Sequence, residues 1–219
     1  RIRNHLLPYF GTMRMKDIEK RDVVQLINDQ LPDYKPGSIN RVIILLRYMF
    51  NLAIKWEVEG VFRNPTAGIP LLKENNQVER FLSVEEAKAL LIAIKASKNP
   101  MLQHIVSMLI LTGARKREVL DAKWEDFDME RTSWRIPNTK AGKARIVPLS
   151  DTATALLTKL RKKKRSPYAF ANPITLKPYK SIYYSWHTAR KEAGLDDVRI
   201  HDLRHSFASF LVNAGRSLY

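Results

Sequence analysis

Three short stretches of this sequence hold residue types that could bind an anion and move its protons. The first covers residues 111–120 (LTGARKREVL), where an apolar segment ends at a Thr-Gly pair and Arg115 stands where a new helix should begin. Helix N-termini attract anions, and an Arg beside them can hold a phosphate with two hydrogen bonds. Glu118 follows one helical turn later and should share a face with Arg115. Taken alone, the motif is equally typical of a surface ion pair on a short helix.

The second stretch, residues 138–143 (NTKAGK), is predicted to be the tip of a β-hairpin. It carries Lys140 and Lys143. A lysine on a flexible stem at a turn can protonate a leaving oxygen as a general acid, or it can bind a phosphate. A simply solvated basic turn has the same composition.

His201 and Arg204 belong to the third stretch, residues 201–205 (HDLRH). On a helix, two residues three apart project from one face. An imidazole and a guanidinium on one face suit a phosphodiester, because Arg stabilises negative charge while His transfers a proton. The alternative interpretation is a polar, capped helix start.

The first 72 residues are predicted to form a helical domain. Residues 22–31 carry apolar side chains at helical spacing, and residues 32–37 (PDYKPG) indicate a turn. Ser38 is a suitable N-cap for a long helix that runs to about Trp56. Residues 73–80 are polar and lack periodicity, which indicates an interdomain linker.

Residues 81–219 predict a second domain, mostly helical, with a small antiparallel sheet. Ser83 and Glu86 form a capping-box pattern at the start of its first helix. The periodicity predicts helices over about 83–97, 101–112 and 150–164, further helices from 181 and 201, and strands at 132–136 and 144–148. The predicted fold class is therefore mainly α.

The composition favours a polyanionic partner. Lys and Arg total 38 against 22 Asp and Glu, which gives a net charge of +16. Residues 1–78 hold 12 basic and 8 acidic side chains, and residues 79–219 hold 26 and 14, so the net charges are +4 and +12. Nucleic acid or an anionic membrane surface is therefore the leading partner class, and a generally basic protein is the alternative.

The absence of cysteine excludes disulfides and thiolate metal sites, and it suits a reducing cytosol. We expect no run apolar enough to span a bilayer and therefore no membrane partner. The chain starts directly in helical-looking sequence at Arg1, so we expect that part of the first domain is missing.

In this order, the three motifs resemble the catalytic domain of the tyrosine recombinases, the phage integrase family. That pattern is an Arg in a T-G-x-R-x-x-E-[LV] turn, a Lys on a β-hairpin, then H-x-x-R, and it falls on Arg115 with Glu118, Lys140, and His201 with Arg204. The first domain is similar to the helical, SAM-like core-binding domain of the family. The resemblance covers nearly the whole chain.

The resemblance implies a reaction that needs no metal or other cofactor. A tyrosine hydroxyl attacks DNA, leaves a 3′-phosphotyrosine and frees a 5′-hydroxyl. Arg115 and Arg204 would stabilise the phosphate, Lys140 would protonate the 5′-oxygen, His201 would assist proton transfer, and Glu118 would orient the cluster. The implied partners are double-stranded DNA at attachment sites, a homotetramer of the full-length protein, and accessory directionality or DNA-bending proteins. The implied location is the cytoplasm of a bacterium, at the nucleoid, for a host- or phage-encoded protein.

The sequence departs from the family pattern after Arg204. The family has an L-G-H-like stretch and then the nucleophilic Tyr, whereas this chain reads HSFASFLVNAGRSLY to its last residue. Tyr219 comes too early to be that nucleophile, and the other tyrosines precede the H-x-x-R motif. We therefore expect a truncated catalytic domain that binds DNA but does not cleave it.

Basic and polar residues of both domains are candidates for DNA contact. The candidate DNA-binding residues are Lys35, Asn40, Arg41, Arg47 and Lys143. Residues 161–165 (RKKKR) could touch the DNA backbone, and a solvated helix end is an equal alternative. The alternative functions are an integrase-like module that occupies DNA without cutting it and, more distantly, a type IB topoisomerase-like enzyme.

Overall fold

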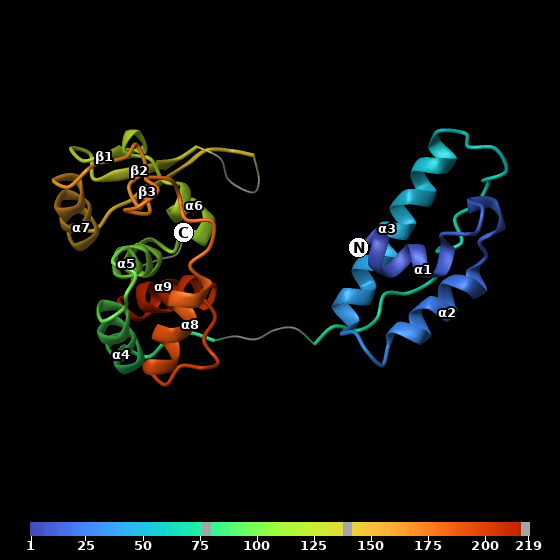
Figure 1. Ribbon diagram of the computed structural model, residues 1–219, viewed down its shortest axis with the longest axis horizontal. Coiled ribbons are helices and arrows are strands. Elements are labelled where there is room, and N and C mark those ends of the chain that lie inside the picture. Colours follow the sequence, from blue (N-terminus) through green and yellow to red (C-terminus); the bar gives the residue numbers. More distant parts are fainter. Residues whose placement is uncertain (76–79, 138–141, 216–219) are drawn as a thin grey trace. The chain divides into compact units, whose positions relative to one another are not determined.

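The computed structural model describes residues 1–75, 80–137 and 142–215. The chain divides into two compact units, residues 1–77 and 78–219. Both units are mainly helical, and the second adds a small antiparallel sheet (Figure 1). The predicted fold class is confirmed.

The first unit is built around one long helix. Its elements are a π-helical turn Ile2–Leu6, α1 (Leu7–Phe10), a 3-10 turn Met15–Asp17, α2 (Lys20–Gln30) and α3 (Pro36–Lys55). The apolar faces of these elements and of the segment after α3 meet in one core, whose most buried members are Val23, Leu26, Ile39, Val42, Ile43 and Phe50.

The start of α3 differs from the prediction. The helix begins at Pro36, with Lys35 as its N-cap in extended conformation, so Ser38 lies inside the first turn and does not cap it. Proline at the first helical position has its φ angle already set, and its missing N–H is one that would find no intrahelical partner. The predicted end near Trp56 is confirmed, since the last helical residue is Lys55.

The expectation that no segment could span a bilayer also needs correction. By length and composition alone, α3 is long and apolar enough, with 20 residues and a mean hydropathy of 1.2. Its apolar residues include Ile39, Ile43 and Phe50, which are fully buried in the core of the first unit. This packing accounts for the apolar side chains on the buried face of the helix.

The second unit is organised around α5. Its helices are α4 (Val84–Lys95), α5 (Leu102–Thr112), α6 (Lys116–Asp121), α7 (Asp151–Arg161), α8 (Tyr183–Glu192) and α9 (Asp202–Asn213). Helix α5 contacts α4, α6, α7 and α9. It runs between the sheet and the group of α4, α8 and α9 (Figure 1). Apolar residues of α5 are therefore buried on several sides, among them Leu102, Ile105, Val106 and Met108.

Three short strands make the sheet, in the order β1-β2-β3, with both pairs antiparallel. Their bounds are β1 Phe127–Asp128, β2 Ser133–Ile136 and β3 Arg145–Pro148. The two predicted strands are confirmed, each one residue shorter at its start. The sequence did not predict β1, which has too few residues to show an alternating pattern.

Two predicted helix caps are confirmed in detail. The Ser83 hydroxyl accepts a hydrogen bond from the Glu86 amide, and the Glu86 carboxylate accepts one from the Ser83 amide. The Ser150 hydroxyl accepts a hydrogen bond from the Ala153 amide at the start of α7. These caps satisfy amides that no helical carbonyl can reach.

Candidate functional site

Arg115 stands at the start of α6, where the chain turns sharply after α5. Gly113 ends α5 with a φ of +59°, a left-handed conformation that glycine adopts without a steric cost. Arg115 is the N-cap of α6. The Glu118 carboxylate accepts hydrogen bonds from the Arg115 amide at 2.7 Å and from its guanidinium at 2.9 Å. The two residues therefore interact as a capping pair, which fixes the direction of the arginine.

A second arginine shares the same carboxylate. Arg145, at the start of β3, donates from Nη2 to Glu118 Oε2 at 2.7 Å. The Glu118 side chain is only 6% exposed, so it depends on these donors for the hydrogen bonds that water would otherwise give. From the sequence, Arg145 was expected only as a strand residue. The available signal was its place directly after the basic hairpin tip.

Arg204 joins the third motif to the first. Its guanidinium donates to the Gly113 carbonyl at 2.6 Å, across 91 residues of sequence. Burial lowers the pKa of Arg204, the positive charges of Arg145 and Arg115 lower it further, and Glu118 opposes them. The hydrogen bonds of Glu118 to Arg115 and Arg145, and of Arg204 to Gly113, gather three guanidinium groups around one carboxylate. We call Arg115, Glu118, Arg145 and Arg204 the arginine cluster.

His201 is the N-cap of α9 and lies three residues before Arg204. Burial lowers its pKa, and the charges of His205 and Arg204 lower it further. The imidazole is therefore mostly neutral at neutral pH, so it can accept a proton. An anion bound at the arginine cluster would oppose these charges and raise the pKa of His201 again.

A fully buried carboxylate sets the start of α9. Asp202 is 0% exposed and accepts hydrogen bonds from the Arg199 amide at 2.8 Å and from the Arg199 guanidinium at 2.7 Å. Acceptance of an amide from the preceding loop closes the first turn of the helix. Asp202, which lies between His201 and Arg204 in the sequence, therefore helps to position both residues at the start of α9.

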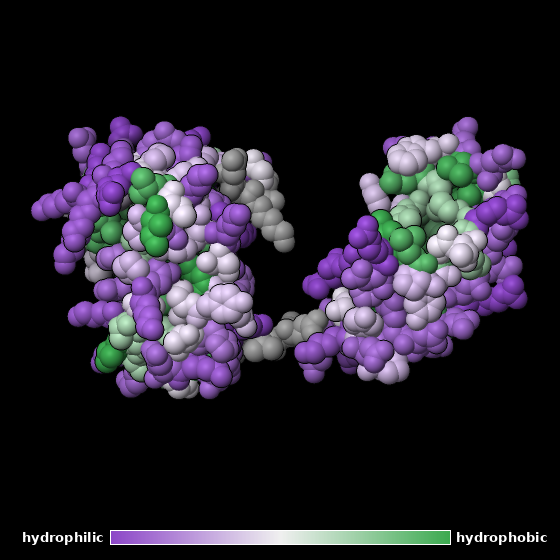
Figure 2. Space-filling view, in the orientation of Figure 1, coloured by the Kyte–Doolittle hydropathy of each residue, from purple (hydrophilic) through white to green (hydrophobic). Residues whose placement is uncertain are grey.

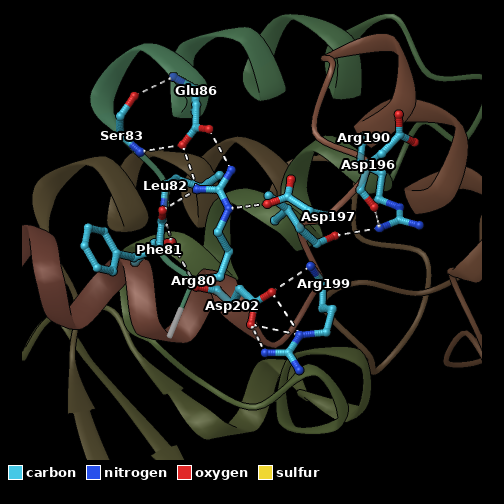
Figure 3. A network of polar contacts seen from close by, with 12 residues as sticks. Arg80, Phe81, Leu82, Ser83, Glu86, Arg190, Asp196, Asp197, Arg199 and Asp202 are labelled. Carbon is cyan, nitrogen blue, oxygen red and sulfur yellow. Dashed lines mark hydrogen bonds and ion pairs between the residues drawn. The ribbon is translucent and has the colours of Figure 1, made fainter. Parts of the chain in front are cut away.

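The loop before α9 is held from two further sides (Figure 3). The Arg80 guanidinium binds the Asp197 carboxylate at 2.7 Å and both oxygens of Glu86, at 2.6 and 2.9 Å. The Arg190 guanidinium donates to the carbonyls of Asp196 and Val198. Arg80 is the last residue of the segment expected to be a linker, and it is engaged in the second unit. The sequence predicted none of these contacts, because each partner is remote in sequence or lies in a loop.

Two predicted residues lie outside the part of the chain that the structure describes, namely Lys140 and Tyr219. Lys143 is described and exposed, two residues before β3. The structure thus brings Arg115, Glu118, His201 and Arg204 into one region and gives no position for the candidate general acid.

The DNA contacts predicted for α3 separate into two groups. Lys35 and Arg41 are exposed. Asn40 is 2% exposed, and its amide group bonds the backbone of Leu72 at 2.8 and 2.9 Å. Arg47 donates to the Ile69 carbonyl at 2.9 Å. Asn40 and Arg47 attach the segment after α3 to the helix. The predicted DNA contact of Asn40 does not fit this position, because its hydrogen-bonding groups face the interior.

Residues 80–218 match the phage integrase family, and residues 1–31 match the N-terminal SAM-like domain of phage integrases. The chain belongs to the phage integrase family. The resemblance to tyrosine recombinases that rested on three short motifs is therefore confirmed.

Curated relatives include the integrase of Salmonella phage P22, which is 32% identical over 194 residues, 83% of this chain and 49% of that protein. Tyrosine recombinase XerA of Saccharolobus solfataricus is 27% identical over 224 residues, 94% of this chain and 74% of that protein. The chain thus spans about half the length of the P22 integrase.

Solved integrase structures share the fold. A lambda integrase dimer bound to a COC′ core site aligns with a TM-score of 0.75 at 19% identity, over 92% of this chain and 76% of that chain. The Tn1549 transposon integrase in complex with circular intermediate DNA aligns with a TM-score of 0.76 at 18% identity, over 95% of this chain and 77% of that chain.

Proposed function

We propose that this integrase-family chain takes part in site-specific recombination of double-stranded DNA through a 3′-phosphotyrosine intermediate. The observation that carries the proposal is the arginine cluster, in which Glu118 holds Arg115 and Arg145 while Arg204 reaches the Gly113 carbonyl. Such preorganised positive charge stabilises a phosphate whose negative charge grows in the transition state. The second unit is the proposed catalytic domain, and the first is the proposed core-binding domain.

The proposed chemistry exchanges one phosphate ester for another. A tyrosine hydroxyl gives its proton to His201 as its oxygen bonds to the phosphorus, the bond to the DNA 5′-oxygen breaks, and Lys140 gives that oxygen a proton. His201 assists the proton transfers, and Arg115 and Arg204 bind the phosphate oxygens. Attack by a 5′-hydroxyl on the phosphotyrosine reverses these steps on the partner strand. Proposed partners of the whole protein are further copies of itself, as a tetramer on two duplexes, and accessory directionality or DNA-bending proteins.

For the 219-residue polypeptide itself, we propose DNA binding without cleavage. The described tyrosines all precede the H-x-x-R helix in sequence, and the hydroxyl of Tyr179 is engaged as a donor to Asn99 at 2.9 Å. A nicked suicide substrate that traps phosphotyrosine should give no covalent adduct with this polypeptide. An adduct that maps to Tyr219 would contradict the proposal.

The cluster is tested by exchange of Arg204 for lysine, which keeps the charge but removes the planar guanidinium that can donate to the Gly113 carbonyl and to a phosphate together. Loss of one hydrogen bond from the guanidinium to a DNA phosphate should weaken duplex binding at least about 10-fold, the lower end of about 1.5–3 kcal/mol for hydrogen bonds to charged groups. Arg131→Lys is the matched control, because the Arg131 side chain is 86% exposed on a turn. Equal binding by the two variants in a fluorescence titration would argue against a phosphate site at Arg204.

A further inference from the structure

Six cations follow one another at the end of α7, on positions 159–165. They are Lys159, Arg161, Lys162, Lys163, Lys164 and Arg165, and we call them the α7 basic run. All six are exposed on the surface. Among the described residues, no carboxylate forms an ion pair with any of the six.

The helix dipole explains only part of this charge. Cations are favoured in the last turn of a helix, which accounts for Lys159 and Arg161. The effect fades beyond the last turn, yet four more cations follow the end of α7 at residues 162–165. Like charges this close repel one another. The run is therefore slightly unfavourable for the isolated fold, and a bound anion would compensate its charge.

The backbone of the α7 basic run is fixed at both ends. The amides of Lys163 and Lys164 donate to the carbonyls of Leu160 and Arg161, which closes a tight turn. Directly afterwards, the Ser166 hydroxyl donates to the Leu176 carbonyl at 2.7 Å, and the Trp124 amide donates to the Pro167 carbonyl. The cations thus project from a constrained support, which reduces the entropy cost of binding a ligand.

The run lies away from the arginine cluster. Helix α7 is at one edge of the second unit, and α6 is at the opposite edge (Figure 1). Figure 2 shows strongly hydrophilic side chains gathered over the α7 edge. Hollows of about 390 and 310 Å³ flank the turn, one lined by Arg161 and Lys162 and the other by residues 163–165.

The charge of the run affects the pKa of a neighbouring histidine. His104, on α5, is half-buried beside Lys159 in a hollow between α5 and α7. Burial lowers its pKa, and the charges of Lys159 and Lys163 lower it further. An anion bound at the run would oppose this field and raise the pKa of His104.

We propose that the α7 basic run is a second DNA site, which binds the phosphate backbone of a duplex without sequence preference. Duplex DNA carries one charge per about 1.7 Å of axis, so a run on the order of 10 Å long faces several phosphates. The described run has no exposed aromatic side chain on which unpaired bases could stack, which favours duplex over single strands. It also lacks an exposed apolar anchor, which disfavours a protein partner. The site is independent of the recombination chemistry and of the arginine cluster.

The experiment compares two triple variants of the whole chain. The test variant carries Lys162→Gln, Lys163→Gln and Lys164→Gln, and the control carries Lys88→Gln, Lys95→Gln and Lys98→Gln. All six lysines are exposed on the same unit, so both variants remove three charges. Binding of a 12-base-pair duplex of random sequence is followed by fluorescence anisotropy over a series of salt concentrations.

The parent chain and the control should bind two duplexes at low salt, and the test variant one. The log–log salt slope of the test variant should be smaller by about 2.7, because three cations are removed and each neutralised phosphate contributes about 0.9 to the slope. Unchanged stoichiometry and slope in the test variant would overturn the proposal. So would a test variant that retains full duplex binding but no longer binds polyglutamate, because that result would assign the run to an acidic protein.

A second readout does not depend on affinity at the other site. In the parent chain, addition of the duplex should raise the NMR titration midpoint of the His104 imidazole, and the test variant should show no such rise. The variant Arg115→Gln with Arg204→Gln separates the two sites. This variant should no longer bind a duplex at the arginine cluster, but DNA should still raise the titration midpoint of His104. The second site can therefore be tested even if the proposed role of the arginine cluster is wrong. A His104 midpoint that DNA does not move in the parent chain would contradict the second site.

Discussion

The two strongly basic regions of the second unit hold their charges in opposite ways. In the arginine cluster, each guanidinium is paired, with the nearly buried Glu118 carboxylate or with the Gly113 carbonyl. In the α7 basic run, no described carboxylate pairs with any of the six cations. Paired charges are fixed in direction and suit a single phosphate, whereas unpaired charges suit a diffuse polyanion. Substitutions in each region can break or sharpen this difference.

The largest expected effect comes from removal of the shared carboxylate. Glu118→Gln leaves Arg115 and Arg145 without a counter-charge near Arg204. The free energy of unfolding should fall by about 3 kcal/mol, the lower end for a broken buried pair, because both arginines are partly exposed. Urea denaturation measures it. Glu130→Gln, at an exposed position, should change it by less than about 0.5 kcal/mol. Similar midpoints for the two variants would show that Glu118 does not hold the cluster.

The next effect concerns the turn that carries Arg115. In Gly113→Ala, the new Cβ would overlap the ring of Phe207 on α9, at a left-handed backbone position. Strain and overpacking together should cost about 2–3 kcal/mol. Gly194→Ala has a similar φ of +70° but nothing within 4 Å, so it isolates the backbone strain. Thermal unfolding that gives equal destabilisation would show that α9 does not press on this turn.

Neutralisation of the basic run should stabilise the folded chain, in contrast to the two substitutions above. Because Lys162, Lys163 and Lys164 repel one another, their exchange for glutamine should raise the free energy of unfolding slightly, by at most about 0.5 kcal/mol. The same urea measurement applies, with the Lys88, Lys95 and Lys98 variant as control. A clear loss of stability would mean that the lysines have structural partners and that the contrast with the cluster is wrong.

The smallest effect is a dependence of stability on pH. The pKa of His104 is lowered in the folded chain, so the unfolded chain binds more protons between the folded value and about 6.5. Stability should therefore fall as the pH is lowered through about 6.5, before the carboxylates titrate near about 4.

Midpoints of urea unfolding at about pH 7.5 and 5.5, on either side of the ordinary histidine pKa, measure this decrease. His104→Gln should reduce the decrease and leave the share of His201, whose pKa is also lowered. Exchange of Lys159 and Lys163 for glutamine should reduce it as well, because their charges depress the pKa of His104. An unchanged decrease in both variants would mean that the run does not act on this histidine.

Local signals predicted much of the fold. The Ser83–Glu86 capping box and the Ser150 cap could be predicted because a cap joins residues three apart in sequence. The start of α3 was misplaced because a proline at the first helical position competes with a serine two residues later, and both are good helix starts. The two-residue β1 left no pattern, since its partner β2 and the stacking of Phe127 on Trp134 define it.

The sequence by itself determined the motifs, their order and the family, because residue type and spacing are enough to recognise a chemical pattern. It could not show that Glu118 also holds Arg145, or that Arg204 reaches the Gly113 carbonyl, since these contacts cross 27 and 91 residues. Nor could it separate Asn40, which faces the interior, from Arg41, which faces solvent. Only tertiary packing decided which charges are paired and which are left for an external ligand, because pairing depends on neighbours in space.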